Sequence, residues 1–298
     1  MAVISVKIPP LFATVAAVIL LAGVPIRPAS ADYIGSELGA AGNWAVLEVG
    51  TGSVTMNGGS VVGNVGVTGG SFTLTGGTIN GSADLGTGVI FTHTGGSVTG
   101  SINTKFDLSS AVSAAQGAST AFTALKATQS VANGQINAST IINALNSGGL
   151  NVIDLSGITL NGQVLTLSGS AGTEFVLNDS GAMTLNTAQI VLTGGLSAND
   201  VVFNDTGAGS VTITGGVVDG TILAPNASVT MASGRVNGEI IGGSSVTLTG
   251  GQVVDAPAPG PVIGAGLPAF ALLGGGFLLA WRLRRRAERG QLSMPAGL

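Results

Sequence analysis

Serine and threonine hydroxyls are the most regularly spaced polar groups in this sequence. They recur in a repeat of alternating polar and apolar residues, which reads SVTMNGG from Ser53, SFTLTGG from Ser71, SVTITGG from Ser210 and SVTLTGG from Ser245. Successive side chains of a strand point to opposite faces, so the hydroxyls share one face and the apolar residues the other. The apolar set must face an interior, and the hydroxyls therefore form an outward surface.

This outward surface is the candidate binding site. In stacked coils, equivalent residues lie about 4.8 Å apart, and a Thr-x-Thr pair on one strand spans about 6.7 Å. Such a grid of methyls and hydroxyls could order water as ice does; alternatively, threonine is a good strand former and the face has no further role. Asn57 and Ala232 interrupt the outer column, and we expect the middle of the chain to lose the register. The candidate residues are Thr55, Thr73, Thr75, Thr92, Thr94, Thr212, Thr214, Thr230, Thr247 and Thr249.

Other reactive groups are sparse. The chain has no cysteine, which excludes disulfides, thiol nucleophiles and Cys-ligated zinc. Its one histidine, His93, occupies an inward position aligned with Met56 and Leu74. A lone histidine in such a position is typical of a core or corner residue, so we expect no metal site there.

The carboxylates do not suggest catalysis. Polysaccharide-cleaving sites need paired carboxylates, whereas Asp84, Asp219 and Glu239 are scattered along the chain. The repeat lacks the recurring aspartate of calcium-binding β-rolls, and no phosphate-binding G-x-x-x-x-G-K occurs. We expect no enzymatic activity, cofactor or metal. Three further aspartates fall in turn sequences, which explain them without chemistry: Asp179, Asp200 and Asp205.

The charge balance limits the partners. Only 8% of the 298 residues are charged, and residues 32–255 contain 13 acidic and three basic side chains. Nucleic acids and anionic lipids require lysine and arginine patches. Neither is therefore expected to bind this part of the chain.

Glycine pairs mark a regular period. They begin at Gly58, Gly76, Gly95, Gly194, Gly215 and Gly250, and Ser233-Gly234 has the same role. A period near 18 residues with alternation inside it is typical of a β-solenoid, here an all-β solenoid with three short strands per coil. The expected inward residues of the first strand are Val54, Met56, Phe72, Leu74, Phe91, His93, Val211, Ile213, Val229, Met231, Val246 and Leu248, and those of the second are Val61, Ile79, Val98, Val218, Val236 and Val253.

One helix interrupts the repeats at about residues 107–128. Asp107 or Ser109 could cap its start, and its apolar stripe consists of Leu108, Val112, Ala115, Phe122 and Leu125. We expect this helix to cover one side of the solenoid. Short strands resume after it, so residues 32–255 are interpreted as one domain.

The N-terminal 31 residues have the features of a secretory signal peptide. Lys7 precedes an apolar run over residues 11–24, and Ala29-Ser30-Ala31 forms an A-x-A cleavage site. Cleavage is predicted between Ala31 and Asp32. The protein is therefore expected to be exported.

The C-terminal end predicts a membrane anchor. A Pro/Gly linker over residues 256–263 leads into 18 uncharged residues, 264–281, which as a helix would span about 27 Å. Trp281 sits at its end, and residues 282–298 form a basic tail that belongs on the cytoplasmic side. A buried core helix with a basic end is the alternative.

This C-terminal segment resembles the PEP-CTERM sorting tail of Gram-negative bacteria, which implies an exosortase-type processing partner. The resemblance covers about residues 256–289, with APAPGPVIGAGLP in place of a Pro-Glu-Pro motif, and it leaves open whether the tail is cleaved. It implies a protein of the cell envelope or cell surface. The residues that carry it are Pro259, Pro261, Arg282, Arg284, Arg285 and Arg286.

The body resembles two related families. LGAAGNWAVLEVG, residues 38–50, is similar to the opening of ice-binding-like bacterial domains, which are β-helices with a flanking helix. Residues 201–243 resemble the choice-of-anchor A surface proteins, in which one exported domain is carried on different anchors. These resemblances imply an envelope-anchored structural or adhesive protein that presents its hydroxyl face to matrix polysaccharide, a neighbouring cell or water. Ice binding through the threonines is the alternative, and a polysaccharide-active enzyme is a third, less favoured hypothesis.

Overall fold

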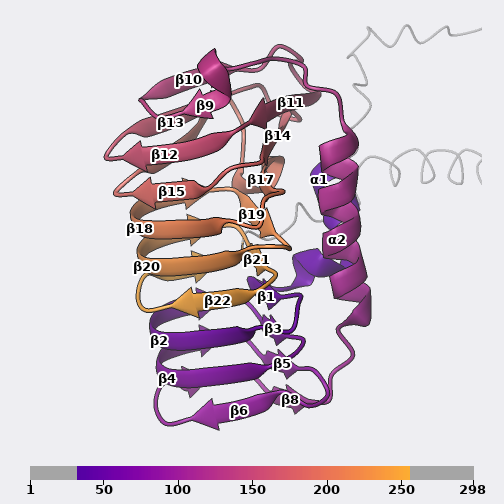
Figure 1. Cartoon of the computed structure of the whole chain (residues 1–298), viewed down its shortest axis with the longest axis vertical. Helices are drawn as coiled ribbons and strands as arrows, with labels where there is room; N and C mark the ends of the chain where they lie inside the picture. Colours follow the sequence, from indigo (N-terminus) through magenta and orange to yellow (C-terminus); the bar gives the residue numbers. More distant parts are fainter. Residues whose placement is uncertain (1–31, 256–298) are drawn as a thin grey trace, which may run out of the picture.

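The computed structural model describes residues 32–255, which form a parallel β-solenoid with a helix along one side (Figure 1). This confirms the expected architecture of stacked parallel strands. The predicted signal peptide, the linker, the C-terminal apolar segment and the basic tail lie outside the described residues. Within residues 32–255, no helix is long and apolar enough to cross a bilayer.

One side of the solenoid, here called the helix face, is a nine-stranded parallel sheet. Most of its strands are buried on both sides, because the interior lies behind them and helix α2 (Ser109–Ala124) lies in front. From one end to the other its strands are β11 (Leu150–Leu155), β14 (Glu174–Asp179), β17 (Val201–Asp205), β19 (Thr221–Ala224), β21 (Ile240–Gly242), β1 (Val46–Glu48), β3 (Val65–Val67), β5 (Ala83–Leu85) and β8 (Ile102–Thr104).

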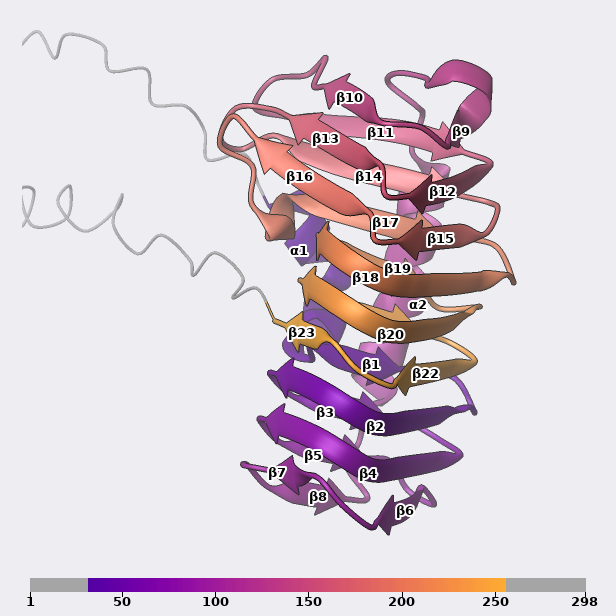
Figure 2. The same cartoon turned by 90° about the vertical axis from the view of Figure 1, so that its left-hand side faces the viewer.

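The other two sides are open to solvent and share their longest strands. The threonine face consists of β9 (Gln135–Ile136), β12 (Gly157–Asn161), β15 (Met183–Asn186), the first halves of β18 (Ser210–Asp219) and β20 (Ser228–Asn237), β22 (Ser245–Leu248), the first halves of β2 (Ser53–Val62) and β4 (Ser71–Asn80), and β6 (Ile90–His93). The second open face consists of β10 (Thr140–Asn143), β13 (Val164–Ser168), β16 (Gln189–Thr193), the second halves of β18 and β20, β23 (Gln252–Val254), the second halves of β2 and β4, and β7 (Ser97–Val98). Figure 2 shows the long strands bending between the two faces.

The coils do not stack in the order of the sequence. Residues 46–104 form one stack of coils and residues 135–254 form another, and α2 carries the chain from the end of the first stack toward the far end of the second (Figure 1). The last coil then pairs with the first: β21 pairs with β1, and β22 and β23 pair with β2. The sequence repeats did not predict this joint.

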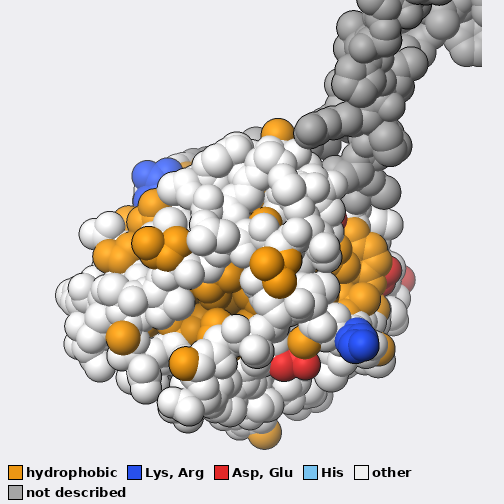
Figure 3. Space-filling model, turned by 90° about the horizontal axis from the view of Figure 1, so that it is seen from above, with side chains coloured by type: hydrophobic (Ala, Val, Ile, Leu, Met, Phe, Trp, Pro, Cys, Tyr) orange, Lys and Arg blue, Asp and Glu red, His pale blue; other side chains and the backbone are white. Residues whose placement is uncertain are grey.

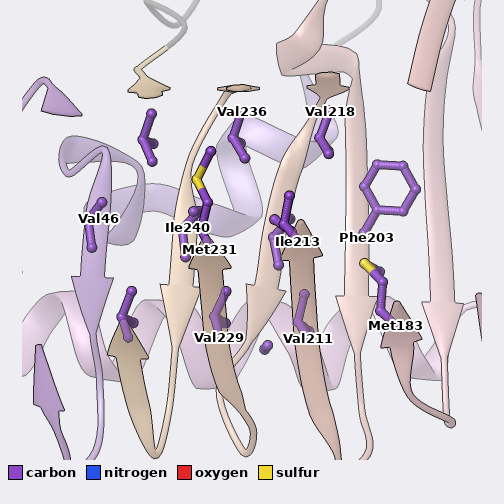
Figure 4. Close-up of a cluster of buried hydrophobic side chains, with 14 of the residues drawn as sticks. Val46, Met183, Phe203, Val211, Ile213, Val218, Val229, Met231, Val236 and Ile240 are labelled. Carbon is purple, nitrogen blue, oxygen red and sulfur yellow. The ribbon is translucent and has the colours of Figure 1, made fainter. Parts of the chain in front are cut away.

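The interior is a continuous apolar column. Val211 and Ile213 of β18 lie beside Val229 and Met231 of β20 and point into the same space (Figure 4). Most of the predicted inward residues are indeed buried. The exceptions belong to the last coil of the first stack: Phe91 and Val98 are half-buried and His93 is exposed.

The flanking helix is shorter than predicted. It begins at Ser109 and ends at Ala124, and its N-cap is Leu108, with no side-chain cap. Asp107 instead accepts a hydrogen bond from the backbone N–H of Ser109 through Oδ1, at 3.0 Å. The predicted stripe packs on the helix face, with Leu108, Ala115 and Phe122 buried.

Asparagines of the helix face hold the end of α2. Asn178 donates to the Phe122 carbonyl at 2.9 Å, and Asn204 donates to the Ser119 carbonyl at 3.2 Å. The Phe122 carbonyl also accepts from the N–H of Leu125 at 3.2 Å, and the Ser119 carbonyl from the Thr123 hydroxyl at 2.7 Å. The two amides therefore add second hydrogen bonds that tie the end of the helix to the helix face. Four short helical segments were not predicted: α1 (Tyr33–Leu38), η1 (Gly39–Asn43), η2 (Ala132–Gly134) and η3 (Ala198–Asp200).

Candidate binding face

A single column of eight threonines runs along the middle of the threonine face. Each threonine is in register with the next across parallel strands, including the joint between the two stacks, where Thr247 pairs with Thr55. Neighbours in the column are therefore about 4.8 Å apart, the separation of paired strands. In order along the face the column is Thr159, Thr184, Thr212, Thr230, Thr247, Thr55, Thr73 and Thr92.

Two of these threonines were missed in the sequence, and the expectation that the middle of the chain loses the register was wrong. Thr159 and Thr184 are separated by 25 residues, and Thr184 and Thr212 by 28, because these coils carry longer loops at their corners. The glycine-pair period of about 18 therefore does not extend to these coils. A local signal was present: ITLN ends at Asn161 and MTLN at Asn186, matching VTMN at Asn57.

Two further columns flank the central one. Serines of successive coils align on one side, and Ser210, Ser228, Ser245, Ser53 and Ser71 follow one another in register. The outer column contains the predicted Thr214, Thr249, Thr75 and Thr94. It is interrupted as expected at Asn57 and Ala232, and also by Asn161 and Asn186, which are in register with Thr214. The Thr75 hydroxyl donates to Oδ1 of Asn57, so part of this interruption is bridged.

The hydroxyls of the central column are available to solvent. Within residues 32–255, none of the eight forms a hydrogen bond with another protein group. Thr92 and Thr159 are exposed, and the other six are partly exposed. By contrast, Thr68 lies at a corner and its hydroxyl is used within the protein, since it donates to the buried carboxylate of Glu48 at 3.0 Å.

No acidic or basic side chain points outward from the strands of the threonine face in the described chain. Buried acids instead secure the corners: Oδ1 of Asp179 accepts from the N–H of Gly181 at 3.0 Å, and Oδ1 of Asp205 from that of Gly207 at 2.9 Å. Burial, together with the charge of Asp179, raises the pKa of Asp205 to about 6. These turn contacts agree with the role predicted for both aspartates.

The remaining candidate carboxylates lie apart from one another. Asp84 accepts hydrogen bonds from Trp44 at 2.9 Å and from Asn103 at 2.7 Å, and Asp219 accepts from Asn237 on the second open face. Glu239 is buried beside a cavity of about 120 Å³ under α1. Within the described chain, no three His, Cys, Asp or Glu side chains are placed to hold a metal ion.

The first residue of the predicted domain caps a short helix. Asp32, the expected first residue after cleavage, is the N-cap of α1, and its Oδ1 accepts from the N–H of Gly35 at 2.8 Å. Ala31 and the residues of the predicted sorting tail lie outside the described residues.

A family model for an ice-binding-like adhesive domain matches residues 29–254. Among solved structures, an ice-binding protein from the Antarctic ascomycete Antarctomyces psychrotrophicus has a TM-score of 0.56 at 26% identity, over 74% of this chain and 98% of the relative. An ice-binding protein from an Antarctic Flavobacteriaceae bacterium has a TM-score of 0.57 at 24% identity, over 76% of this chain and 48% of that one. A glycosylated ice-binding protein from an Arctic yeast has a TM-score of 0.50 at 18% identity, over 76% and 96%. A comparison with curated protein sequences finds no match.

Proposed function

We propose that this chain, which belongs to the ice-binding-like adhesive domain family, binds ice through its threonine face. The observation that carries the proposal is the uninterrupted column of eight threonines, whose hydroxyls have no partner within the described residues. The ascomycete relative, at 26% identity, is itself an ice-binding protein. This favours the hypothesis that the sequence offered as an alternative to a matrix role.

The physical basis is a preorganised grid. Each threonine presents a hydroxyl that can hold a water molecule and a methyl group that confines its neighbours, on a repeat of about 4.8 Å along the column. The grid is held in place from inside, because the alternate residues of the same strands, such as Val229 and Met231, are fully buried. Each contact is weak, and the affinity comes from their number.

The absence of charge on this face supports the same role. Burying a charged group against a surface that cannot solvate it is unfavourable, and ice cannot reorganise its water molecules as the liquid does. The outward positions from Ser53 to Asn57 and from Ser245 to Thr249 carry only hydroxyl and amide groups. Ordered water can therefore lie against this face without displacing the hydration shell of an ion.

Adhesion is the second candidate, and the description of the family as adhesive favours it. A neutral, hydroxyl-rich surface could also bind matrix polysaccharide through many weak contacts. The predicted export signal and C-terminal anchor, which lie outside the described residues, would hold either ligand close to the cell envelope. We propose no enzymatic role, since Asp84 and Asp219 are hydrogen-bonded and lie on different sides of the solenoid.

The proposal is tested on residues 32–255 by thermal hysteresis and inhibition of ice recrystallisation. The test variant carries Thr73→Tyr, Thr212→Tyr and Thr247→Tyr, which place bulky rings along the column. We expect activity in the parent and none in the folded variant. A folded parent without activity would refute ice binding and would leave matrix adhesion, to be tested by retention on immobilised polysaccharide.

A further inference from the structure

Helix α1 and the segment after it cover a cavity beside the joint between the two stacks. The joint pairs Val46 of β1 with Ile240 of β21, and the N–H of Ile240 donates to the Ala45 carbonyl at 2.9 Å. Glu239 directly precedes β21, and α1 and η1 precede β1, so the joint brings these segments together. The cavity between them has a volume of about 120 Å³ and is lined by both ends of the domain sequence.

Glu239 is the buried carboxyl group of this cavity. It is only 8% exposed, and its Oε2 atom is buried without a hydrogen-bond partner in the described chain. Glu48 is equally enclosed, but its Oε1 accepts from the N–H of Gly50 at 2.8 Å and its Oε2 from the Thr68 hydroxyl at 3.0 Å. A buried polar atom without a partner is unfavourable. An occupant of the cavity that provides a partner for Glu239 would therefore be stabilised.

Glycines keep the cavity open next to its two carboxylates. A Cβ built on Gly42 would lie 3.4 Å from Oε1 of Glu239, and one built on Gly35 would collide with Oδ2 of Asp32. Oδ1 of Asp32 accepts from the N–H of Gly35, which leaves Oδ2 without a protein partner in residues 32–255. Both side chains thus present oxygen atoms that the protein itself does not use.

The surroundings of the cavity are acidic. Burial raises the pKa of Glu239 to about 8 and that of Glu174 above its usual value, and the neighbouring charges of Asp255 and Asp32 add to the two shifts. Within residues 32–255, none of these four acids forms an ion pair with a basic side chain. Figure 3, which looks onto the β9–β10–β11 end, shows only isolated charged side chains there. Negative charge is therefore concentrated around α1, where it attracts cations.

We propose that this cavity, here called the α1 cavity, binds a calcium ion through the carboxylates of Asp32 and Glu239. Its other polar side chains are those of Asn43, Asn199 and Thr221, and they offer amide and hydroxyl oxygens. Ligands of this kind suit hard divalent cations, and calcium accepts about six to eight oxygens in a flexible geometry that water can complete. The site uses two carboxylates, so it does not need a cluster of three acidic side chains, which the described residues do not form.

A bound ion would connect the two ends of the domain sequence. Asp32 is the N-cap of α1, whereas Glu239 immediately precedes the last strand that pairs with β1. The sequence gave no signal of this site, because only the joint brings the two carboxylates to one cavity. The inference does not rest on ice binding, since the α1 cavity lies apart from the threonine column. A failure of one would not be a failure of the other.

Isothermal titration with calcium chloride tests the inference on residues 32–255 that have been freed of metal with EDTA. The ascomycete relative is covered over 98% of its length by this domain, so the domain exists there as a separate protein. We expect one saturable site in the parent and an affinity at least about tenfold lower in Glu239→Gln, which removes a charged ligand. The matched control is Glu37→Gln on α1, outside the cavity lining, which should bind like the parent.

A steric variant tests the same site with both carboxylates intact. Gly42→Ala adds a methyl group beside Oε1 of Glu239 and should weaken calcium binding. Gly117→Ala on α2, where nothing lies within 4 Å of the added Cβ, should leave binding unchanged. Equal affinities of these two variants would contradict binding in the α1 cavity.

Thermal unfolding followed by circular dichroism gives a second readout. A ligand that binds only the folded state raises its melting temperature, so roughly 10 mM calcium chloride should raise that of the parent by at least about 3 °C. Magnesium, which demands a stricter geometry and dehydrates reluctantly, should give a much smaller rise.

Three results would overturn the inference. The first is a folded parent that shows no saturable calcium binding, and the second is an equal affinity of the parent and Glu239→Gln. The third is an equal rise in melting temperature with magnesium, which would indicate general screening of the acidic groups around α1.

Discussion

The two open faces of the solenoid are built from the same long strands but differ in their outward residues. On the threonine face, one residue type occupies eight successive positions. On the second open face, the corresponding column changes from coil to coil, with Ile141, Thr166 and Val191 in register, followed by Asp219, Asn237, Val254, Val62 and Asn80.

The inward residues do not show this difference. Val229 and Met231 behind the threonine face and Val236 behind the second face are all fully buried and apolar. Strand propensity favours threonine on any exposed strand, so it should act on both faces equally. The column on one face alone therefore needs a further explanation, and a ligand for that face provides one.

The largest effect is expected from breaking the corner that both faces share. Gly216 has a φ of +81°, and a Cβ built on it would lie 1.8 Å from the Ala188 carbonyl oxygen. Gly216→Ala should lower the free energy of unfolding by at least about 2 kcal/mol, because the backbone conformation is strained for alanine and the contact is too close. Urea denaturation measures the change.

The control for this variant is Gly117→Ala in α2, where nothing lies within 4 Å of the added Cβ. Alanine in a helix interior should stabilise the protein by about 0.5–1 kcal/mol. Equal effects of the two substitutions on the free energy of unfolding would contradict the claim that the corner requires glycine at position 216.

An effect that is smaller per pH unit separates the stability of the solenoid from the activity of the threonine face. Burial raises the pKa of Glu239 from 4.5 to about 8, with a contribution from the charge of Asp255. Between these two pH values the folded state holds a proton that the unfolded chain has lost. The free energy of unfolding should therefore fall as pH rises, by up to about 1.4 kcal/mol per pH unit.

Denaturant melts between pH 5 and pH 9 check this dependence. Glu239→Gln should flatten the slope between pH 6 and pH 8, whereas Glu37→Gln on α1 should leave it in place. Since no carboxylate, lysine or arginine points outward from the threonine face in residues 32–255, ice activity per folded molecule should stay constant over this range. A strong pH dependence of that activity would argue for an ionisable site elsewhere.

The smallest effect is expected from lengthening the column. Asn137 follows Gln135 and Ile136, which are in register with Gly157 and Ile158, so it occupies the position next to Thr159. Asn137→Thr should raise thermal hysteresis modestly and change stability by no more than about 0.5 kcal/mol, as expected of an exposed site. The control is Asn143→Thr, in the same coil on the second open face, which should have no effect on thermal hysteresis. An equal gain from both variants would mean that hysteresis does not depend on which face carries the added threonine.

Much of this architecture could be predicted from sequence, because each coil repeats the same requirements. Alternation located the inward residues from Val54 to Val253, and the hydroxyl positions identified six of the eight column threonines. The stacking order could not be predicted, since the SVT repeats at Ser53 and Ser245 offer nearly identical edges and nothing local selects the neighbour of a coil. Thr159 and Thr184 were missed because their longer corner loops obscure the period.

His93 is a second example of a property that depends on the stacking order and could not be predicted from sequence. Its inward position was predicted correctly, since it pairs with Leu74. Its exposure follows from its being in the last coil of a stack. Position within a coil is encoded locally, whereas position within the stack is a property of the whole fold.

The most direct test of the central claim compares two substitutions on the single strand β20. Thr230→Tyr places a ring in the threonine column, and Asn237→Tyr places the same ring on the second open face. Incorporation of fluorescently labelled protein into a growing ice hemisphere is the measurement. We predict that Thr230→Tyr abolishes incorporation while Asn237→Tyr incorporates like the parent, and equal incorporation of both variants would contradict ice binding by the threonine face.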